Sequence, residues 1–115
     1  LHPLRVMLRL GSNEERIAGV LHDVLEDTKW TADDLRREGF SEVVLKALDA
    51  VTRRKDESYC DFVDRANQNE IGRRIKLADL EDNCDLSRIA NPQEKDFARI
   101  EKYRRAIIRM RRSDA

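Results

Sequence analysis

The sequence contains few of the features that mark secreted or membrane proteins. Its 115 residues include two cysteines, Cys60 and Cys84, which are far apart and form no CxxC pair. Isolated cysteines are more often buried thiols than disulfide partners, so we expect a reduced, cytoplasmic protein. The longest apolar run, IAGVL, is far too short to cross a bilayer, and no signal sequence is visible. We therefore expect no membrane partner.

The chain also lacks net charge, although charged residues are abundant. They make up 40% of the sequence, against about 25% in a typical protein, yet Lys plus Arg (23) equals Asp plus Glu (23). A neutral molecule has no overall field to attract nucleic acid. The basic segment KYRRAIIRMRR is the only support for such binding. Its Ile107, Ile108 and Met110 favour an amphipathic helix with a basic, solvated face, so we expect no nucleic-acid partner.

The fold is predicted to be all-α. With two prolines and four glycines, the chain shows no linker, repeat or low-complexity tract, and its length suits a single domain over residues 1–115. Apolar residues recur every three or four positions, and no stretch alternates as a strand would. The first predicted helix covers HPLRVMLRL, and the second covers residues 14–27 after a cap at Ser12 or Asn13. A short helix is opened by Thr31 and ended by Gly39, and Ser41 opens the next. Two further helices cover residues 59–67 and 70–89, and a last helix, capped by Asn91, runs to about Arg111.

The stretch LHDVLEDTKW carries an unusual excess of acids. His22, Asp23, Glu26 and Asp27 lie together with no Lys or Arg between Arg16 and Lys29. On a helical wheel these residues lie opposite an apolar stripe of Ile17, Leu21, Val24, Leu25 and Thr28. Acids in the last turn of a helix are unfavourable by about 0.3–1 kcal/mol each, and bases at i±4 that could offset them are absent. The pattern leaves open a cation site and a solvated face.

The stretch EIGRRIKLADLEDNCDL favours the cation site. Gly72, Lys76, Asp79 and Asn83 form one stripe, because they follow a 4, 3, 4 spacing. Apolar residues flank this stripe on both sides, with Ile71, Ile75 and Ala78 on one and Leu77, Leu80 and Cys84 on the other. A helix that is apolar on two flanks is largely buried, and a buried Asp79 needs a partner or a metal. Lys76, three residues away, is the alternative partner.

A histidine at the start of the chain completes a set of metal-binding residue types. His2, His22, Asp23 and Asp79 would supply two imidazoles and two carboxylates, which suit Mn, Fe or Zn and do not distinguish among them. Adjacent residues of a helix point about 100° apart. His22 and Asp23 can therefore share an ion only if both side chains lean toward it.

These residues, in this order, resemble the HD superfamily of metal-dependent phosphohydrolases. The closer resemblance is to the hydrolase domain of RelA/SpoT-type proteins and the metazoan SpoT homologue, small alarmone hydrolases that remove pyrophosphate from guanosine 3′,5′-bis(diphosphate). The similar segments are HPLRV, AGVLHDVLEDT, VTRRKDESYCDFV, IKLADLEDN and RIEKY. The resemblance implies an HD-domain helical bundle that binds a nucleotide substrate. The family has a further helix upstream of its first metal-binding histidine, and because this chain begins at Leu1 we expect it to lack that helix.

The resemblance also implies a role for individual residues. His2, His22, Asp23 and Asp79 would bind the metal, usually Mn²⁺ in this family. Glu26 and Asp27 match the acidic pair that positions and activates water. The substrate-binding residues would be Asn83, which faces the nucleotide, Arg99 and Tyr103, which hold substrate, and Lys76 at the edge of the site.

Two other functions remain open at the level of sequence. One is an HD hydrolase of another nucleotide, because the metal ligands indicate the type of reaction better than they indicate the nucleobase of the substrate. The other is an HD domain that binds a nucleotide or a partner without turnover. Glu26 and Asp27 argue against the second, since a binding module has no need of a water-activating pair. The sequence does not indicate the oligomeric state.

Overall fold

The computed structural model describes residues 2–112, except for the side chains of Pro3, Val24, Asp27 and Arg88. The prediction of an all-α fold is confirmed: within residues 2–112 there are seven α-helices, one short 3-10 helix and no strand. The elements are α1 (His2–Leu8), α2 (Asn13–Asp27), α3 (Ala32–Arg37), α4 (Glu42–Ala50), α5 (Tyr59–Asn67), α6 (Glu70–Asn83), η1 (Leu86–Arg88) and α7 (Glu94–Arg112). No helix among the described residues is long and apolar enough to cross a membrane.

Most of the predicted helix starts are correct because their caps form as expected. Ser12 and Thr31 accept hydrogen bonds from the backbone of the third residue of α2 and α3, and the Glu15 and Asp34 side chains accept in return from the cap backbones. Ser41 caps α4 in the same way, without the reciprocal bond. Gly39 follows α3 with φ of +95°, a left-handed conformation that favours glycine.

Two predicted boundaries are wrong. The helix predicted over residues 70–89 ends at Asn83, and the separate turn η1 follows, because the Asp85 side chain accepts a hydrogen bond from the backbone of Ser87 and competes with continued helix. The last helix begins at Glu94 rather than directly after Asn91. Its first-turn bonds run to the Gln93 carbonyl, and the Asp96 carboxylate accepts from the Gln93 N–H at 2.9 Å.

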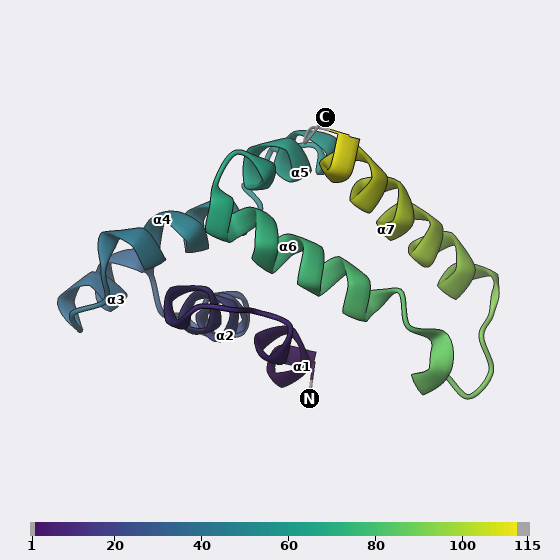
Figure 1. The fold of residues 1–115 in the computed structure, drawn as a ribbon, viewed down its shortest axis with the longest axis horizontal. Helices are drawn as coiled ribbons and strands as arrows, with labels where there is room; N and C mark the ends of the chain where they lie inside the picture. The colour runs from purple at the N-terminus through teal and green to yellow at the C-terminus, as the bar shows by residue number, and fades with distance from the viewer. Residues whose placement is uncertain (1, 113–115) are drawn as a thin grey trace.

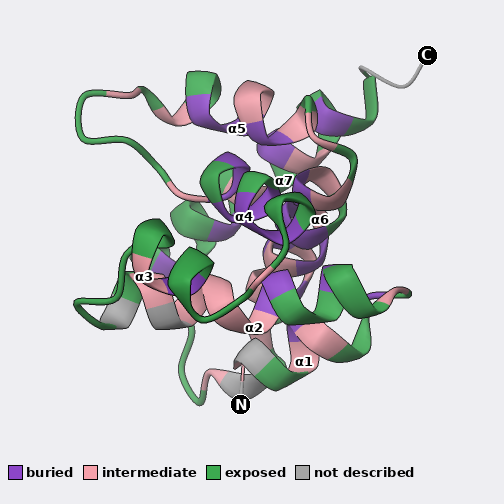
Figure 2. Cartoon of the chain, turned by 90° about the vertical axis from the view of Figure 1, so that its left-hand side faces the viewer, coloured by how far each residue is buried: buried purple, intermediate pink, exposed green. Residues whose placement is uncertain are grey.

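Helix α6 lies in the middle of the molecule and is buried on two sides, as predicted (Figure 1). Ile75 and Ala78 join one apolar cluster with residues of α1, α2, α3 and α4, and Ile71 packs against it. Leu80 joins a second cluster with residues of α5 and α7, against which Leu77 packs. The buried residues are concentrated along α4 and α6 in Figure 2. Polar groups on α6 must therefore find partners inside the protein.

The buried side of α2 differs in part from the prediction. Leu21 and Leu25 pack against the core as expected, but Ile17 is 40% exposed and Thr28 is also exposed. Val24 lies outside the described side chains. Ala18 is fully buried instead, since α2 is covered by α1 as well as by the central helices. Compared with the prediction, α2 is therefore rotated about its own axis, so that part of its polar face lies toward neighbouring helices.

The acid Glu15 fastens the start of α2 and is itself only 2% exposed. Its carboxylate accepts from the backbone N–H groups of Gly11 and Ser12, both at 2.8 Å, and from Arg74 of α6 at 2.5 Å. These donors outweigh the cost of burial and lower the pKa of Glu15. Helix α2 is thereby held against α6.

The cysteines are free, as expected, but the expectation that both are buried is wrong. Cys60 is exposed near the start of α5, and Cys84 is partly buried at the end of α6.

Two helical glycines allow neighbouring helices to approach closely. A Cβ on Gly19 would lie 2.8 Å from Leu10 Cδ1, and a Cβ on Gly72 would lie 2.9 Å from the Cβ of Ala50 in α4. We therefore attribute Gly19 to close packing against Leu10, which follows α1, and Gly72 to close packing against α4.

We predict that Gly72→Ala destabilises the protein. The added methyl gains helix propensity worth about 1 kcal/mol but overpacks against the Ala50 methyl, which cannot rotate away. Overpacking typically costs about 1–3 kcal/mol, so after the gain in propensity the free energy of unfolding in urea should fall by up to about 2 kcal/mol. Gly11→Ala is the control, because its Cβ would meet only Glu15 Oε2 at 3.6 Å. Equal stability of the two variants would contradict the packing role.

Candidate functional site

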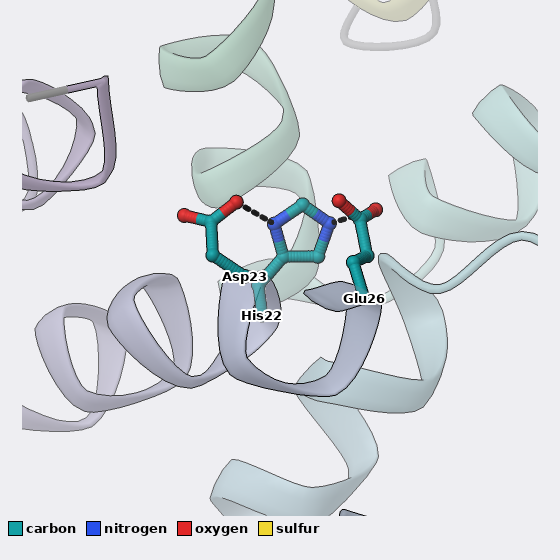
Figure 3. Close-up of side chains that lie close together, drawn as sticks. All are labelled: His22, Asp23 and Glu26. Carbon is teal, nitrogen blue, oxygen red and sulfur yellow. Dashed lines mark ion pairs between the residues drawn. The ribbon is translucent and has the colours of Figure 1, made fainter. Parts of the chain in front are cut away.

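The C-terminal half of α2 places one imidazole between two carboxylates (Figure 3). His22 Nε2 lies 3.0 Å from Glu26 Oε1, and His22 Nδ1 lies 3.9 Å from Asp23 Oδ1. One ligand atom from each of these three residues lies within 4.8 Å of the others, a grouping that could hold a metal ion. The side chains of His22 and Asp23 are thus close enough to share an ion, although the two residues are adjacent in the sequence.

The second imidazole comes from the start of α1 and lies against α6. His2 Nε2 is 2.6 Å from Asp79 Oδ1, and His2 Nδ1 is in contact with Asp82 Oδ2. Asp79 and Asp82 are three residues apart, so both face the same side of α6. His2 thus contacts two aspartates that lie 77 and 80 positions further along the sequence.

Electrostatic interactions link these two groups of residues. Burial disfavours the charged form of His22, but its hydrogen bond to Glu26 and the charges of Glu26, Asp79 and Asp23 outweigh burial and raise its pKa. Burial, opposed by His22 and His2, raises the pKa of Asp23. The hydrogen bond from His22 lowers the pKa of Glu26. Residues of α1, α2 and α6 therefore influence one another across a shared space.

Asp79 lies at the centre of these contacts. Burial would raise its pKa, but the hydrogen bond from His2 and the charges of Lys76, His22 and His2 lower it. Lys76 Nζ is 3.4 Å from Asp79 Oδ2, and Asn83 Nδ2 is 3.3 Å from Asp79 Oδ1. Lys76, the alternative partner of Asp79 that the sequence suggested, does therefore contact it. Its contact is longer than that of His2, and Lys76 Nζ also lies 4.8 Å from the ring centre of Phe62.

The donor types at this site fit a divalent cation. Nitrogen from His2 and His22 and oxygen from Asp23, Asp79 and Glu26 are ligands typical of Mn, Fe and Zn. The two imidazoles already compensate carboxylate charge that a cation would otherwise balance. Of the predicted ligands, the structure thus brings His22 together with Asp23, and His2 together with Asp79.

The predicted water-activating pair is only partly described. Glu26 lies at the rim of the site with its side chain 51% exposed, where it accepts from His22. Asp27 is the last residue of α2, and its side chain lies outside the described residues.

Three of the predicted substrate-binding residues line one pocket between the end of α6 and α7. Its volume is about 260 Å³, and its walls come from Asn83, Asp85, Ile89, Arg99 and Tyr103. Asn83 also contacts Asp79, so it joins the pocket to the candidate metal-binding residues. Lys76 is buried between Asp79 and the Phe62 ring instead of lining this pocket.

Sequence reasoning missed two residues near the site. Asp82 was not distinguished from the other acids of α6, although an Asp three residues beyond Asp79 in a buried helix was an available signal. Tyr59 carried no polar pattern that would single it out, but its hydroxyl is buried and makes no hydrogen bond within the described structure. Burial and the nearby Tyr103 and Asp79 raise the pKa of Tyr59 to about 12.

The chain is similar to two curated proteins over part of its length. It is 37% identical over 86 residues to the guanosine-3′,5′-bis(diphosphate) 3′-pyrophosphohydrolase of Aquifex aeolicus. The matching segment covers 71% of this chain and 12% of that protein. It is 43% identical over 56 residues to the GTP pyrophosphokinase of Streptomyces coelicolor. This matching segment covers 45% of this chain and 6% of that protein. The chain therefore spans only a small part of either relative. No family model matches it.

We predict that the metal-free protein loses stability as pH rises from about 6.5 to about 9. The hydrogen bond to Asp79, opposed by burial and assisted by Asp82, raises the pKa of His2 from 6.5 to about 9. Because the folded pKa is the higher one, His2 stabilises the fold fully below pH 6.5, and this contribution disappears as pH rises through 9. Thermal melts in EDTA should show the decline.

The variant His2→Asn is the comparison for these melts. It has no imidazole to titrate, so its melting temperature should fall less between pH 6.5 and 9 than that of the wild type. Parallel curves for the two proteins would contradict the assignment of the effect to His2.

Proposed function

We propose that this chain is the hydrolase domain of a RelA/SpoT-type protein of the HD superfamily. It would release pyrophosphate from the 3′ position of guanosine 3′,5′-bis(diphosphate), with help from a divalent metal. The observation that carries this proposal is a pair of clusters, His22 with Asp23 and Glu26 on α2 and His2 with Asp79 between α1 and α6. The two clusters interact through their charges, and Asn83 joins Asp79 to a pocket that contains Arg99 and Tyr103. The similarity to the Aquifex aeolicus enzyme supports the choice of substrate.

His2, His22, Asp23 and Asp79 are the proposed metal ligands, and Mn²⁺ is the proposed ion. When bound, such an ion lowers the pKa of coordinated water and neutralises charge on a phosphoryl oxygen. Glu26 is near enough to His22 to contact any ion held there, so it either joins the ligands or acts on water at the edge of the site.

The remaining residues have tasks that follow from their charge and position. Glu26 or Asp27 accepts the proton of the attacking water, whose oxygen forms a bond to phosphorus as the bond to the 3′ oxygen breaks. Arg99 presents a guanidinium to phosphate oxygens, and Tyr103 and Asn83 offer hydrogen bonds and contact area to the nucleotide. Lys76 keeps Asp79 ionised through its charge.

A product assay over a panel of nucleotides with Mn²⁺ tests the proposal. Release of pyrophosphate and GDP from guanosine 3′,5′-bis(diphosphate) is the expected result. Turnover of another nucleotide alone would favour a different HD hydrolase. Binding of nucleotide without any turnover would favour a non-catalytic domain.

We predict that Asp79→Asn abolishes Mn²⁺ binding while the helix content stays nearly unchanged. The substitution keeps the shape of the side chain but removes the charge that a cation requires. Metal content after dialysis and circular dichroism measure the two properties. If mutant and wild type hold equal metal, Asp79 is not a ligand, and its contacts to His2 and Lys76 are only ion pairs within the fold.

We predict that Glu26→Gln combined with Asp27→Asn loses turnover by at least about 100-fold, the usual contribution of a positioned acid or base. Nucleotide affinity should change little. Steady-state rates with saturating Mn²⁺ and equilibrium nucleotide binding give the two values.

Glu14→Gln is the matched control for this double change. Glu14 is exposed at the opposite end of the same helix and should retain full activity. Full activity of the double variant would show that the acids after His22 are only a solvated face.

A further inference from the structure

The imidazole of His2 is held on both sides by α6. Its Nε2 lies 2.6 Å from Asp79 Oδ1, and its Nδ1 contacts Asp82 Oδ2. A histidine that ligates a metal through one ring nitrogen usually donates its other N–H to a carboxylate or carbonyl, which fixes the ring orientation and the tautomer. The ring of His2 has this arrangement, with Asp79 on the side of the candidate ligands and Asp82 on the other.

Asp82 is suited to this task because it is buried and anchored. Its side chain is 1% exposed, and it accepts from Arg5 Nε at 3.0 Å and 3.3 Å. A buried carboxylate needs such a partner to remain charged. Arg5 lies three residues after His2 on α1, so the same face of α1 supplies both groups that contact Asp82.

We propose that Asp82 is a positioning residue for metal binding, and this inference rests on the proposed metal site. An ionised carboxylate only accepts hydrogen bonds, so it keeps the proton of a neutral His2 ring on Nδ1. Nε2 is then available on the side of Asp79, where a cation would be held. In this role Asp82 is not itself a ligand, and it acts on metal binding through His2.

A simpler alternative is that Asp82 merely fastens α1 to α6. The chain offers a matched control for this alternative in the adjacent residue. Glu81 of α6 also contacts the N-terminal segment, through Arg9 directly after α1 at 3.2 Å, and it pairs with Arg111 of α7 at 2.9 Å. Glu81→Gln therefore removes the same charge from the same helix and loosens another ion pair to the N-terminal segment, at a residue with no described contact to His2.

The test compares Mn²⁺ affinity in the full chain for wild type, Asp82→Asn and Glu81→Gln. Asparagine keeps the size of the side chain, but its amide can donate to Nδ1 and so allow the wrong tautomer. Loss of an outer partner of a metal ligand typically costs 10- to 100-fold in affinity, and we expect a loss of about this size in Asp82→Asn. Glu81→Gln should bind within about twofold of wild type. Similar affinities for Asp82→Asn and wild type, or an equal loss in both variants, would overturn the inference.

A second measurement needs no variant of Asp82 and remains informative if Asp82→Asn does not fold. The chain has two histidines, His2 and His22, so ¹⁵N-labelled histidine NMR with Zn²⁺ as a diamagnetic probe is readily assigned with a His22 variant. We expect the His2 ring to carry its proton on Nδ1 in the Zn²⁺-loaded protein. A proton on Nε2 would overturn the inference. A wild-type protein that binds neither Mn²⁺ nor Zn²⁺ would instead refute the metal site of the proposed function, and the role of Asp82 with it.

Discussion

The burial of α6 on two sides is the constraint on which the rest of the structure depends. Leu80 and Ile75 bind this helix to two separate apolar clusters, one with α5 and α7 and one with α1 to α4. Charged residues between the two apolar flanks cannot all reach water, and a buried charge without a partner is costly. Asp79 and Asp82 therefore need partners from other helices, and His2, Arg5 and Lys76 supply them.

The same constraint brings the candidate catalytic groups together. Helix α1 reaches α6 through His2 and Arg5, and α2 reaches it through Glu15 and Arg74. The carboxylate of Asp23 on α2 then interacts with the charges of His2 from α1 and Asp79 from α6, although α2 has no Lys or Arg near it. The charge of Asp23 is thus balanced in part by His2, a residue of another helix. The closest positive partner of Asp23 and Glu26 is His22 of the same helix, which lies between them.

Much of the fold follows from local sequence. Ser12, Thr31 and Ser41 begin helices where their side chains can cap the backbone, and the two apolar flanks of α6 are readable from spacing alone. The wrong helix boundaries lie where a side chain binds the backbone in a way that the apolar spacing does not reveal. Asp85 stops α6 by bonding the next turn, and Asp96 sets the start of α7 through Gln93. The exposure of Ile17 reflects how α1 covers α2, which periodicity does not reveal.

The candidate site divides in the same way. The sequence by itself determined that His22 and Asp23 share a helix with Glu26, and that Asp79 lies on a buried stripe with Asn83, because these relations depend only on helical spacing. The tertiary structure alone decided that His2 would lie between Asp79 and Asp82, that Lys76 would be buried against Phe62, and that Arg99 and Tyr103 would share a pocket with Asn83. The physical reason is that these contacts join residues of different helices, whose distance and rotation are set by how the apolar side chains pack and not by the order of residues in the chain.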